Sequence, residues 1–221
     1  QIRIKGHLSQ QRKEWFDGLT ITWEADGNTL LSLLIQRNKL LSSTEVTSIV
    51  QQIATALDYA HEQGVLHLDL NFRHILIAED RRALLTDFGL DELRRDVYHS
   101  NSDPEKVQPT DISVFTAPEQ ARGDFDIDYR ADIYSLGVLV YAMLVGKLPF
   151  EASDNAELRR EILEQAPPPP NLINPRLPER VANLLNKALA KEPAQRYDSA
   201  GEFAKVLTQS LLWATDDQGL A

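Results

Sequence analysis

The pattern of apolar and polar positions changes along the chain from an extended period to a helical one. Near the start, Ile2 and Ile4 alternate with charged residues, and residues 19–23 are rich in strand formers. The pattern predicts a hairpin or two strands within residues 1–25. A turn at Asp26-Gly27-Asn28 follows, and we expect a short helix to begin at Thr29.

Beyond residue 40 the apolar residues recur mainly at helical spacing. Ser42 and Glu45 have the spacing of a capping box, and one apolar stripe runs from Val46 to Ala60. Gly64 stands where a helix commonly ends in a left-handed residue. Two short strands are predicted at residues 75–77 and 83–86. Further helices are predicted at residues 131–144, which are apolar on every side and therefore buried, at 181–189 and at 200–211.

Two segments between these elements have a loop composition. Residues 91–113 are polar and are expected to form a mobile loop. Pro167 to Pro170 is a run of four prolines, which suits either a polyproline ligand or a rigid loop between helices, and we favour the loop. A few strands followed mostly by helices indicate the α+β class.

Composition narrows the classes of function. The 221 residues include 43% hydrophobic ones, enough for one sizeable domain or two small lobes. A net charge of −10 argues against non-specific binding to nucleic acid or an anionic membrane, and the absence of Cys excludes disulfides and Cys-bound metals. No signal peptide or membrane-spanning run is found, so a cytoplasmic location is expected. The chain starts at Gln1 and its only Met is Met143, so we expect it to be part of a larger product.

Three motifs in the middle of the chain suggest a family. They are the string from His67 to Leu76, then Asp87-Phe88-Gly89, then Ala117-Pro118-Glu119, and Asp69 lies eighteen positions before Asp87. In this order and spacing they resemble the catalytic loop, the metal-binding turn and the end of the activation segment of eukaryotic-type protein kinases. The residues around the third motif, from Ala117 to Gly123, resemble those of bacterial Ser/Thr kinases.

The resemblance covers about residues 19–211 and implies a protein-kinase-like fold. It makes residues 26–221 the mainly helical large lobe and residues 1–25 a remnant of small-lobe strands with the start of the hinge. It also implies two structural interactions. Asp132 would hold the backbone of the catalytic loop, and Glu119 would form a buried bidentate ion pair with Arg196.

The resemblance also assigns a site for ATP and Mg²⁺. Asp69 takes the position of the catalytic base, and Asp87 that of the metal-binding Asp. His74 stands where the family places a second metal ligand. Trp23 takes the gatekeeper position. The adenine would meet the hinge and the strand beyond the catalytic loop, and the residues assigned to it are Glu24, Ala25, Asp26 and Leu76.

Several residues that the family uses for charge are replaced. In the family pattern H-R-D-L-K-P-x-N, the Arg is Leu68, the Lys is Asn71 and the Asn is His74. Leu68 cannot pair with a phosphorylated loop, Asn71 carries no charge for the moving phosphoryl group, and His74 suits Mg²⁺ poorly. The usual Gly-Thr before the third motif reads Asp111-Ile112. The sequence has no glycine-rich phosphate loop, and Lys5 is a poor candidate for the strand Lys.

Three interpretations therefore remain open. The first is a pseudokinase or regulatory module that binds a protein partner. The second is an active, divergent Ser/Thr kinase acting on a protein substrate, seen without most of its small lobe. The third is a structural domain without a ligand. Replacing both the Lys and the Asn predicts a fall in phosphoryl transfer of roughly 10⁴ or more, which favours the first.

Overall fold

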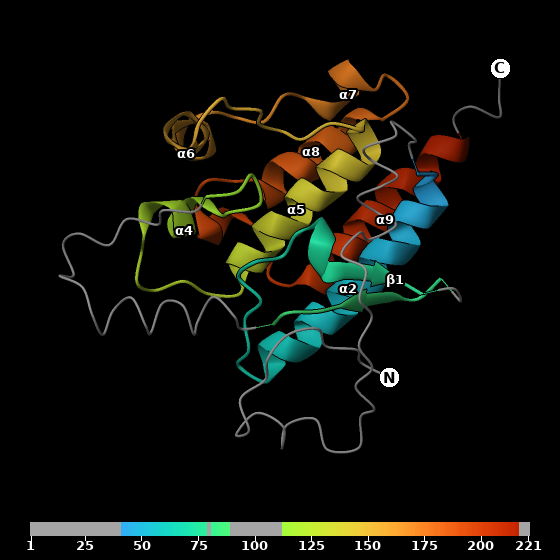
Figure 1. Ribbon diagram of the computed structural model, residues 1–221. Coiled ribbons are helices and arrows are strands. Elements are labelled where there is room, and N and C mark those ends of the chain that lie inside the picture. The colour runs from blue at the N-terminus through green and yellow to red at the C-terminus, as the bar shows by residue number, and fades with distance from the viewer. Residues whose placement is uncertain (1–40, 79–80, 89–111, 217–221) are drawn as a thin grey trace.

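The computed structural model describes residues 41–78, 81–88 and 112–216, with side chains as far as Leu212. This part is mostly helical (Figure 1). Its main helices are α2 (Ser43–Glu62), α5 (Arg130–Val145), α8 (Glu179–Ala188) and α9 (Ala200–Asp216). Shorter elements are α4 (Pro118–Arg122), α6 (Asn155–Glu164), α7 (Pro170–Ile173) and the 3-10 turns η2 (Phe72–His74) and η3 (Pro193–Gln195).

The helix α2 confirms the predicted start and end. Ser42 Oγ accepts a hydrogen bond from the Glu45 backbone N–H, and the Glu45 carboxylate accepts one from the Ser42 N–H, which completes the capping box. Beyond the helix, Gly64 has φ +70°, the left-handed conformation that glycine adopts without a steric penalty. The predicted apolar stripe is buried from Val46 to Leu57, and its last member, Ala60, is half-buried.

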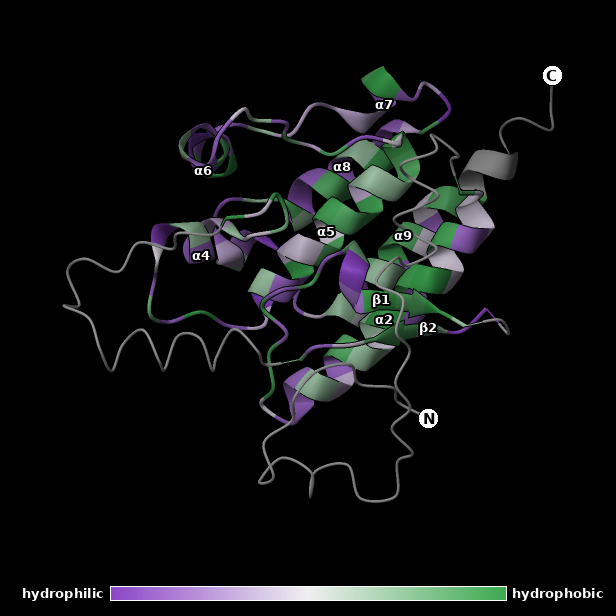
Figure 2. Cartoon of the chain, in the orientation of Figure 1, coloured by the Kyte–Doolittle hydropathy of each residue, from purple (hydrophilic) through white to green (hydrophobic). Residues whose placement is uncertain are grey.

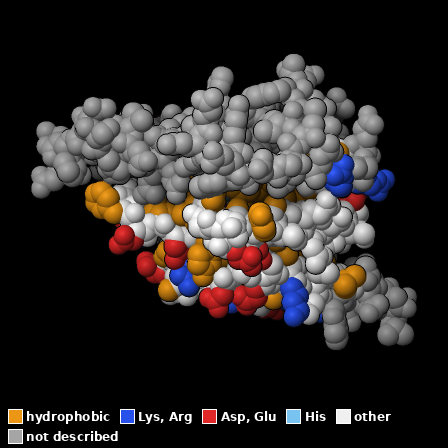
Figure 3. All heavy atoms as spheres, turned by 90° about the horizontal axis from the view of Figure 1, so that it is seen from below, with side chains coloured by type: hydrophobic (Ala, Val, Ile, Leu, Met, Phe, Trp, Pro, Cys, Tyr) orange, Lys and Arg blue, Asp and Glu red, His pale blue; other side chains and the backbone are white. Residues whose placement is uncertain are grey.

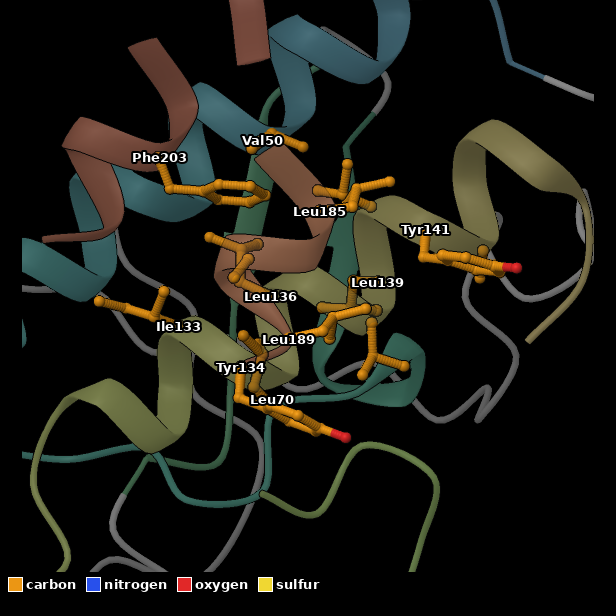
Figure 4. Packing of buried hydrophobic residues seen from close by; sticks show 14 of the residues in the cluster. Val50, Leu70, Ile133, Tyr134, Leu136, Leu139, Tyr141, Leu185, Leu189 and Phe203 are labelled. Atoms are coloured by element: carbon orange, nitrogen blue, oxygen red, sulfur yellow. The ribbon is translucent and has the colours of Figure 1, made fainter. Parts of the chain in front are cut away.

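The helix α5 lies at the centre of the described residues. Every residue from Ala131 to Val145 is buried, as its uniformly apolar sequence predicts. It packs against α2, α8 and α9, and Leu136 and Leu139 lie among Val50, Phe203 and Leu185 from these helices (Figure 4). The close approach of α8 requires Gly137, because a Cβ there would lie only 3.0 Å from the Ala188 Cβ.

The helices α2 and α9 lie side by side and are joined by a carboxylate cap. Asp58 on α2 accepts hydrogen bonds from the backbone N–H groups of Ala200 and Gly201, each at 2.9 Å. These are donors that the first turn of α9 cannot satisfy within the helix. The contact therefore joins the last part of α2 to the first turn of α9, although residues 58 and 200 are far apart in sequence.

The two predicted strands pair as an antiparallel ribbon, β1 (Ile75–Ile77) with β2 (Ala83–Leu85). Ile75 pairs with Leu85 and Leu76 with Leu84. The ribbon contacts α2 through β2, and Gln52 on that helix accepts from the Ala83 N–H at 2.9 Å. Strand β1 begins at Ile75, within the catalytic-loop string, so the ribbon fixes the end of that loop.

The proline run forms a loop that leads into α7, in agreement with the favoured prediction. Pro167 and Pro170 are buried, and the Pro168 carbonyl accepts a hydrogen bond from the Tyr141 hydroxyl at 2.9 Å. These contacts fit a rigid loop between helices.

Several predictions lie outside the described residues. They are the strands and hinge within residues 1–26, the helix from Thr29, Lys5, and all of the predicted loop at 91–113 except its last two residues. None of the helices in the described part combines the length and apolar character needed to cross a bilayer. The face seen from below carries acidic, basic and apolar side chains close together, with acidic ones gathered along its described part (Figure 3).

Candidate active site

The backbone of the catalytic-loop string is held by Asp132, as predicted. This buried residue in the first turn of α5 accepts hydrogen bonds from the N–H groups of His67 at 2.9 Å and Leu68 at 2.7 Å. His61 lies 2.7 Å from the same carboxylate through its Nε2. A buried carboxylate with three donors is well compensated for its loss of water, so it can anchor the loop.

This anchoring supports a strained residue. Leu68 has φ +61°, a conformation that costs a residue with a side chain about 1–3 kcal/mol and is found mostly at functional sites. Its N–H binds Asp132, and its carbonyl accepts a hydrogen bond from Gln120 Nε2 on α4 at 2.7 Å. The side chain of Leu68 is buried in the core. The Gln120 contact was not predicted, and nothing in the sequence beyond its place next to Glu119 indicates it.

Asn71 fixes the position of Asp69. Its Nδ2 donates to both the Asp69 carbonyl and the Asp69 carboxylate Oδ1, each at 2.9 Å. Its Oδ1 accepts from the Arg73 N–H at 2.9 Å and so caps the turn η2. The carboxylate of Asp69 is 40% exposed, so the predicted base stands at an accessible position but shares one oxygen with Asn71.

His74 lies between the two acidic residues predicted for the site. Its Nδ1 is 2.6 Å from the Asp69 carbonyl oxygen and 3.8 Å from the Asp69 Oδ2, and its Nε2 is 3.7 Å from the Asp87 Oδ2. A carbonyl oxygen can only accept, so Nδ1 carries the hydrogen. The structure thus brings Asp69, His74 and Asp87 together.

Asp87 is oriented by its neighbours in the chain. It has φ +64°, a second strained backbone position in this site. Its Oδ2 accepts from the Thr86 hydroxyl at 2.9 Å, and the Thr86 N–H donates to the His74 carbonyl at the same distance. The carboxylate is only 15% exposed. These contacts connect the metal-binding turn directly to the catalytic loop.

The imidazole ring of His67 packs against the rings of His74 and Phe88. It is buried, with its ring 4.8 Å from the Phe88 ring and 5.7 Å from the His74 ring. Burial lowers the pKa of His67 below its usual value, with the His74 ring adding to the effect and the Asp132 carboxylate opposing it.

The remaining predicted ligands are described only in part. Leu76 is half-buried on β1, whereas Glu24, Ala25 and Asp26 lie outside the described residues. Asp87 offers the oxygen ligands that Mg²⁺ prefers, but His74 offers a nitrogen. Across residues 41–78, 81–88 and 112–216, no group of three or more His, Cys, Asp or Glu is placed to hold a metal.

The predicted ion pair between Glu119 and Arg196 joins α4 to the residue that follows η3. Arg196 donates to both carboxylate oxygens of Glu119, at 2.6 and 2.7 Å, and both side chains are buried. The same guanidinium donates to the carbonyls of Ala190 and Arg130, each at 2.9 Å. This bidentate geometry is the strongest form of an Arg–carboxylate contact.

The fold, the ion pair and the anchored acidic loop define the large lobe of a protein kinase. A family model described as "protein kinase domain" matches residues 8–210. The chain therefore belongs to the protein kinase domain family.

Relatives among bacteria and one solved structure support this assignment. The serine/threonine-protein kinase PknF of Mycobacterium tuberculosis is 36% identical over 202 residues, which cover 86% of this chain and 40% of that protein. PknD of the same species is 37% identical over 184 residues, covering 81% and 26%. The structure of Rad53 in complex with AMP-PNP matches with a TM-score of 0.65 at 25% identity, over 84% of this chain and 45% of that one. The chain spans 25% to 40% of the length of the curated relatives that it matches.

Proposed function

We propose that this chain is a kinase-fold regulatory module that binds a protein partner and transfers phosphate poorly. The observation that carries the proposal is the way Asn71 and His74 are used. Both side chains hydrogen-bond to Asp69 within the loop. Asn71 presents no positive charge where the family has a Lys, and His74 presents no oxygen ligand for Mg²⁺ where the family has an Asn.

The consequence for phosphoryl transfer is large. This reaction depends almost wholly on positioning and on stabilising charge in the transition state. Removing one such electrostatic group costs about 10²–10³ in rate, so two independent losses would cost roughly 10⁴ or more. Non-additivity makes the product approximate. Starting from the roughly 1–100 s⁻¹ typical of kinases, this chain would turn over at about 10⁻²–10⁻⁴ s⁻¹.

The groups that keep the fold intact are all retained. Asp132 anchors the loop, and Glu119 and Arg196 form their buried pair. A chain that keeps the kinase fold but replaces residues needed for phosphoryl transfer suits a module that binds another protein. The net charge of −10 favours a protein partner over nucleic acid. A cytoplasmic location completes the proposal.

A second candidate is a divergent Ser/Thr kinase that uses ATP and Mg²⁺ on a protein substrate. Its support is that Asp69 and Asp87 both survive and both approach His74, and that Asp87 itself has a strained backbone conformation. If ATP and Mg²⁺ bind, Asp87 would hold the metal and Asp69 would orient the substrate hydroxyl. Mg²⁺ would supply charge neutralisation for the phosphates.

The test is transfer of radiolabelled phosphate from Mg-ATP to a generic basic protein by the full-length protein. The Asp87→Ala variant, which loses the metal-binding carboxylate, sets the background. We expect a rate at or below about 10⁻² s⁻¹. A wild-type rate within roughly 1–100 s⁻¹ that vanishes in Asp87→Ala would contradict the proposal and establish the second candidate.

A further inference from the structure

We infer that residues 112–116, which directly precede the third motif, are held on the catalytic loop by uncharged contacts and therefore stay in place without phosphorylation. Two contacts carry the inference, the ring pair of Phe72 with Phe115 and the side chain of Gln120. The inference goes beyond the proposed function, because it concerns how this part of the chain is fixed and not what binds to it.

The first contact is aromatic. The rings of Phe72 and Phe115 lie with their centroids 5.4 Å apart and an interplanar angle of 90°, the edge-to-face arrangement that aromatic pairs prefer. Phe72 is buried and begins the turn η2, directly after Asn71. The family pattern has a Pro at this position, and a Pro could not form an aromatic pair. The contact is therefore a consequence of this chain's own sequence.

The second contact is made by Gln120, which bonds in two directions. Its Oε1 accepts a hydrogen bond from the Ala117 N–H at 2.9 Å, and its Nε2 donates to the Leu68 carbonyl at 2.7 Å. The N–H of Leu68 donates to Asp132 on α5, so both backbone groups of this strained residue are bonded. Gln120 thus joins α4 to the peptide bond between Leu68 and Asp69.

Further contacts give the segment a defined conformation. The Phe115 carbonyl accepts a hydrogen bond from the Ser135 hydroxyl on α5 at 2.7 Å. The Ser113 N–H donates to the Thr116 hydroxyl, and the Thr116 N–H donates to the Ser113 carbonyl, each at 3.0 Å. Ile112, which stands where the family has a Thr, is buried in the apolar core. Residues 112–116 are therefore fixed to α5 as well as to the catalytic loop.

These contacts share one chemical property. They join backbone, amide, hydroxyl and aromatic groups, and none of them joins two charged groups. A segment held by pairs between phosphate and Arg depends on the added charge and is weakened by salt. Uncharged contacts depend on neither. We therefore expect residues 112–116 to lie beside Asp69 before any phosphate is added.

The test is amide hydrogen exchange of the full-length protein without nucleotide, measured by mass spectrometry on peptides that cover residues 112–116. Samples are compared before and after treatment with a phosphatase, and in low salt and about 1 M NaCl, where the screening length is about 3 Å. We expect the same protection in all of them. A loss of protection of more than about tenfold after phosphatase treatment or in high salt would overturn the inference.

The variant Gln120→Glu tests the second contact. A Glu can still accept from the Ala117 N–H, as in a capping box, but it cannot donate to the Leu68 carbonyl. We expect exchange at residues 112–116 and at Leu68 to become at least about tenfold faster. The matched control is Gln51→Glu, at an exposed position of α2, which should change neither.

The variant Phe72→Leu tests the first contact, because a Leu fills much of the space of the ring but forms no edge-to-face pair. Exchange at residues 112–116 should become faster by about twofold to tenfold. Peptides from α8 and α9 should keep their wild-type protection in both variants, which shows that the fold is intact. Wild-type exchange at residues 112–116 in both folded variants would overturn the inference. If neither variant folds, the phosphatase and salt measurements on the wild type still decide it.

Discussion

Replacing Arg196 with alanine should destabilise the fold far more than replacing Asp69 with alanine. The guanidinium is fully buried and donates to both oxygens of Glu119 and to the carbonyls of Ala190 and Arg130. Removing one partner of a buried ion pair leaves an uncompensated charge and costs about 3–5 kcal/mol. A cost of about 1 kcal/mol lowers the melting temperature of a domain this size by about 2–4 °C, so we expect a fall of roughly 6–20 °C.

Thermal melts followed by circular dichroism would measure this. Arg122→Ala is the matched control, because Arg122 pairs with Asp124 at 2.9 Å on the surface, where such pairs contribute about 0.2–1 kcal/mol. Asp69→Ala should lose about 0.5–1.5 kcal/mol, the net contribution of its hydrogen bond to Asn71. If Arg196→Ala fails to fold, urea unfolding of Arg196→Lys, which keeps the charge but not the fork, should still show a loss larger than that of Arg122→Ala. Equal losses in Arg196 and Arg122 variants would refute the reasoning.

Three further outcomes follow from the site. Replacing Ser100, Ser102 and Thr110 with Ala in the full-length protein should leave activity unchanged, because the buried Leu68 offers no guanidinium to a phosphate; a large fall traced to these sites would contradict this. Mg-ATP should bind this chain weakly, since its sequence has no glycine-rich phosphate loop, and a calorimetric dissociation constant in the low micromolar range would show otherwise. Stability should fall as pH drops below about 6.5, because the unfolded chain takes up a proton that buried His67, with its lowered pKa, does not. His67→Phe should make the free energy of unfolding, measured with urea, less dependent on pH. An unchanged pH dependence would show that another group causes it.

The sequence predicted those parts of the fold in which several local signals agree. The helix after Ser42 has a cap, an apolar stripe and a terminal glycine, and all three are confirmed. The uniformly apolar helix α5 is buried as expected. The family resemblance placed Asp132 and the Glu119–Arg196 pair correctly, because such buried charges have few alternative partners.

Elements that lack an apolar stripe were missed. The helix α6 is largely polar (Figure 2), and Ile162 is its one buried residue. The available signal was Asp154, which caps the helix by accepting from the Glu157 N–H at 2.8 Å.

The residues of the candidate site were predicted, but the way in which they contact one another was not. The bonds of Asn71 to Asp69 depend on loop geometry that no periodicity encodes, although an Asn directly before a turn that accepts from the N–H two residues on is a known capping pattern. The division at residue 25 and the hinge ligands stay predictions.

The central claim is that Asn71 and His74 limit phosphoryl transfer. The most direct measurement is the rate of radiolabel transfer from Mg-ATP by full-length protein carrying Asn71→Lys together with His74→Asn, compared with wild type and with Asp87→Ala as the background. The account predicts a rise of at least about 10², because one change returns charge to the moving phosphoryl group and the other an oxygen ligand for Mg²⁺. A double variant no faster than a wild type that already transfers phosphate at roughly 1–100 s⁻¹ would contradict it.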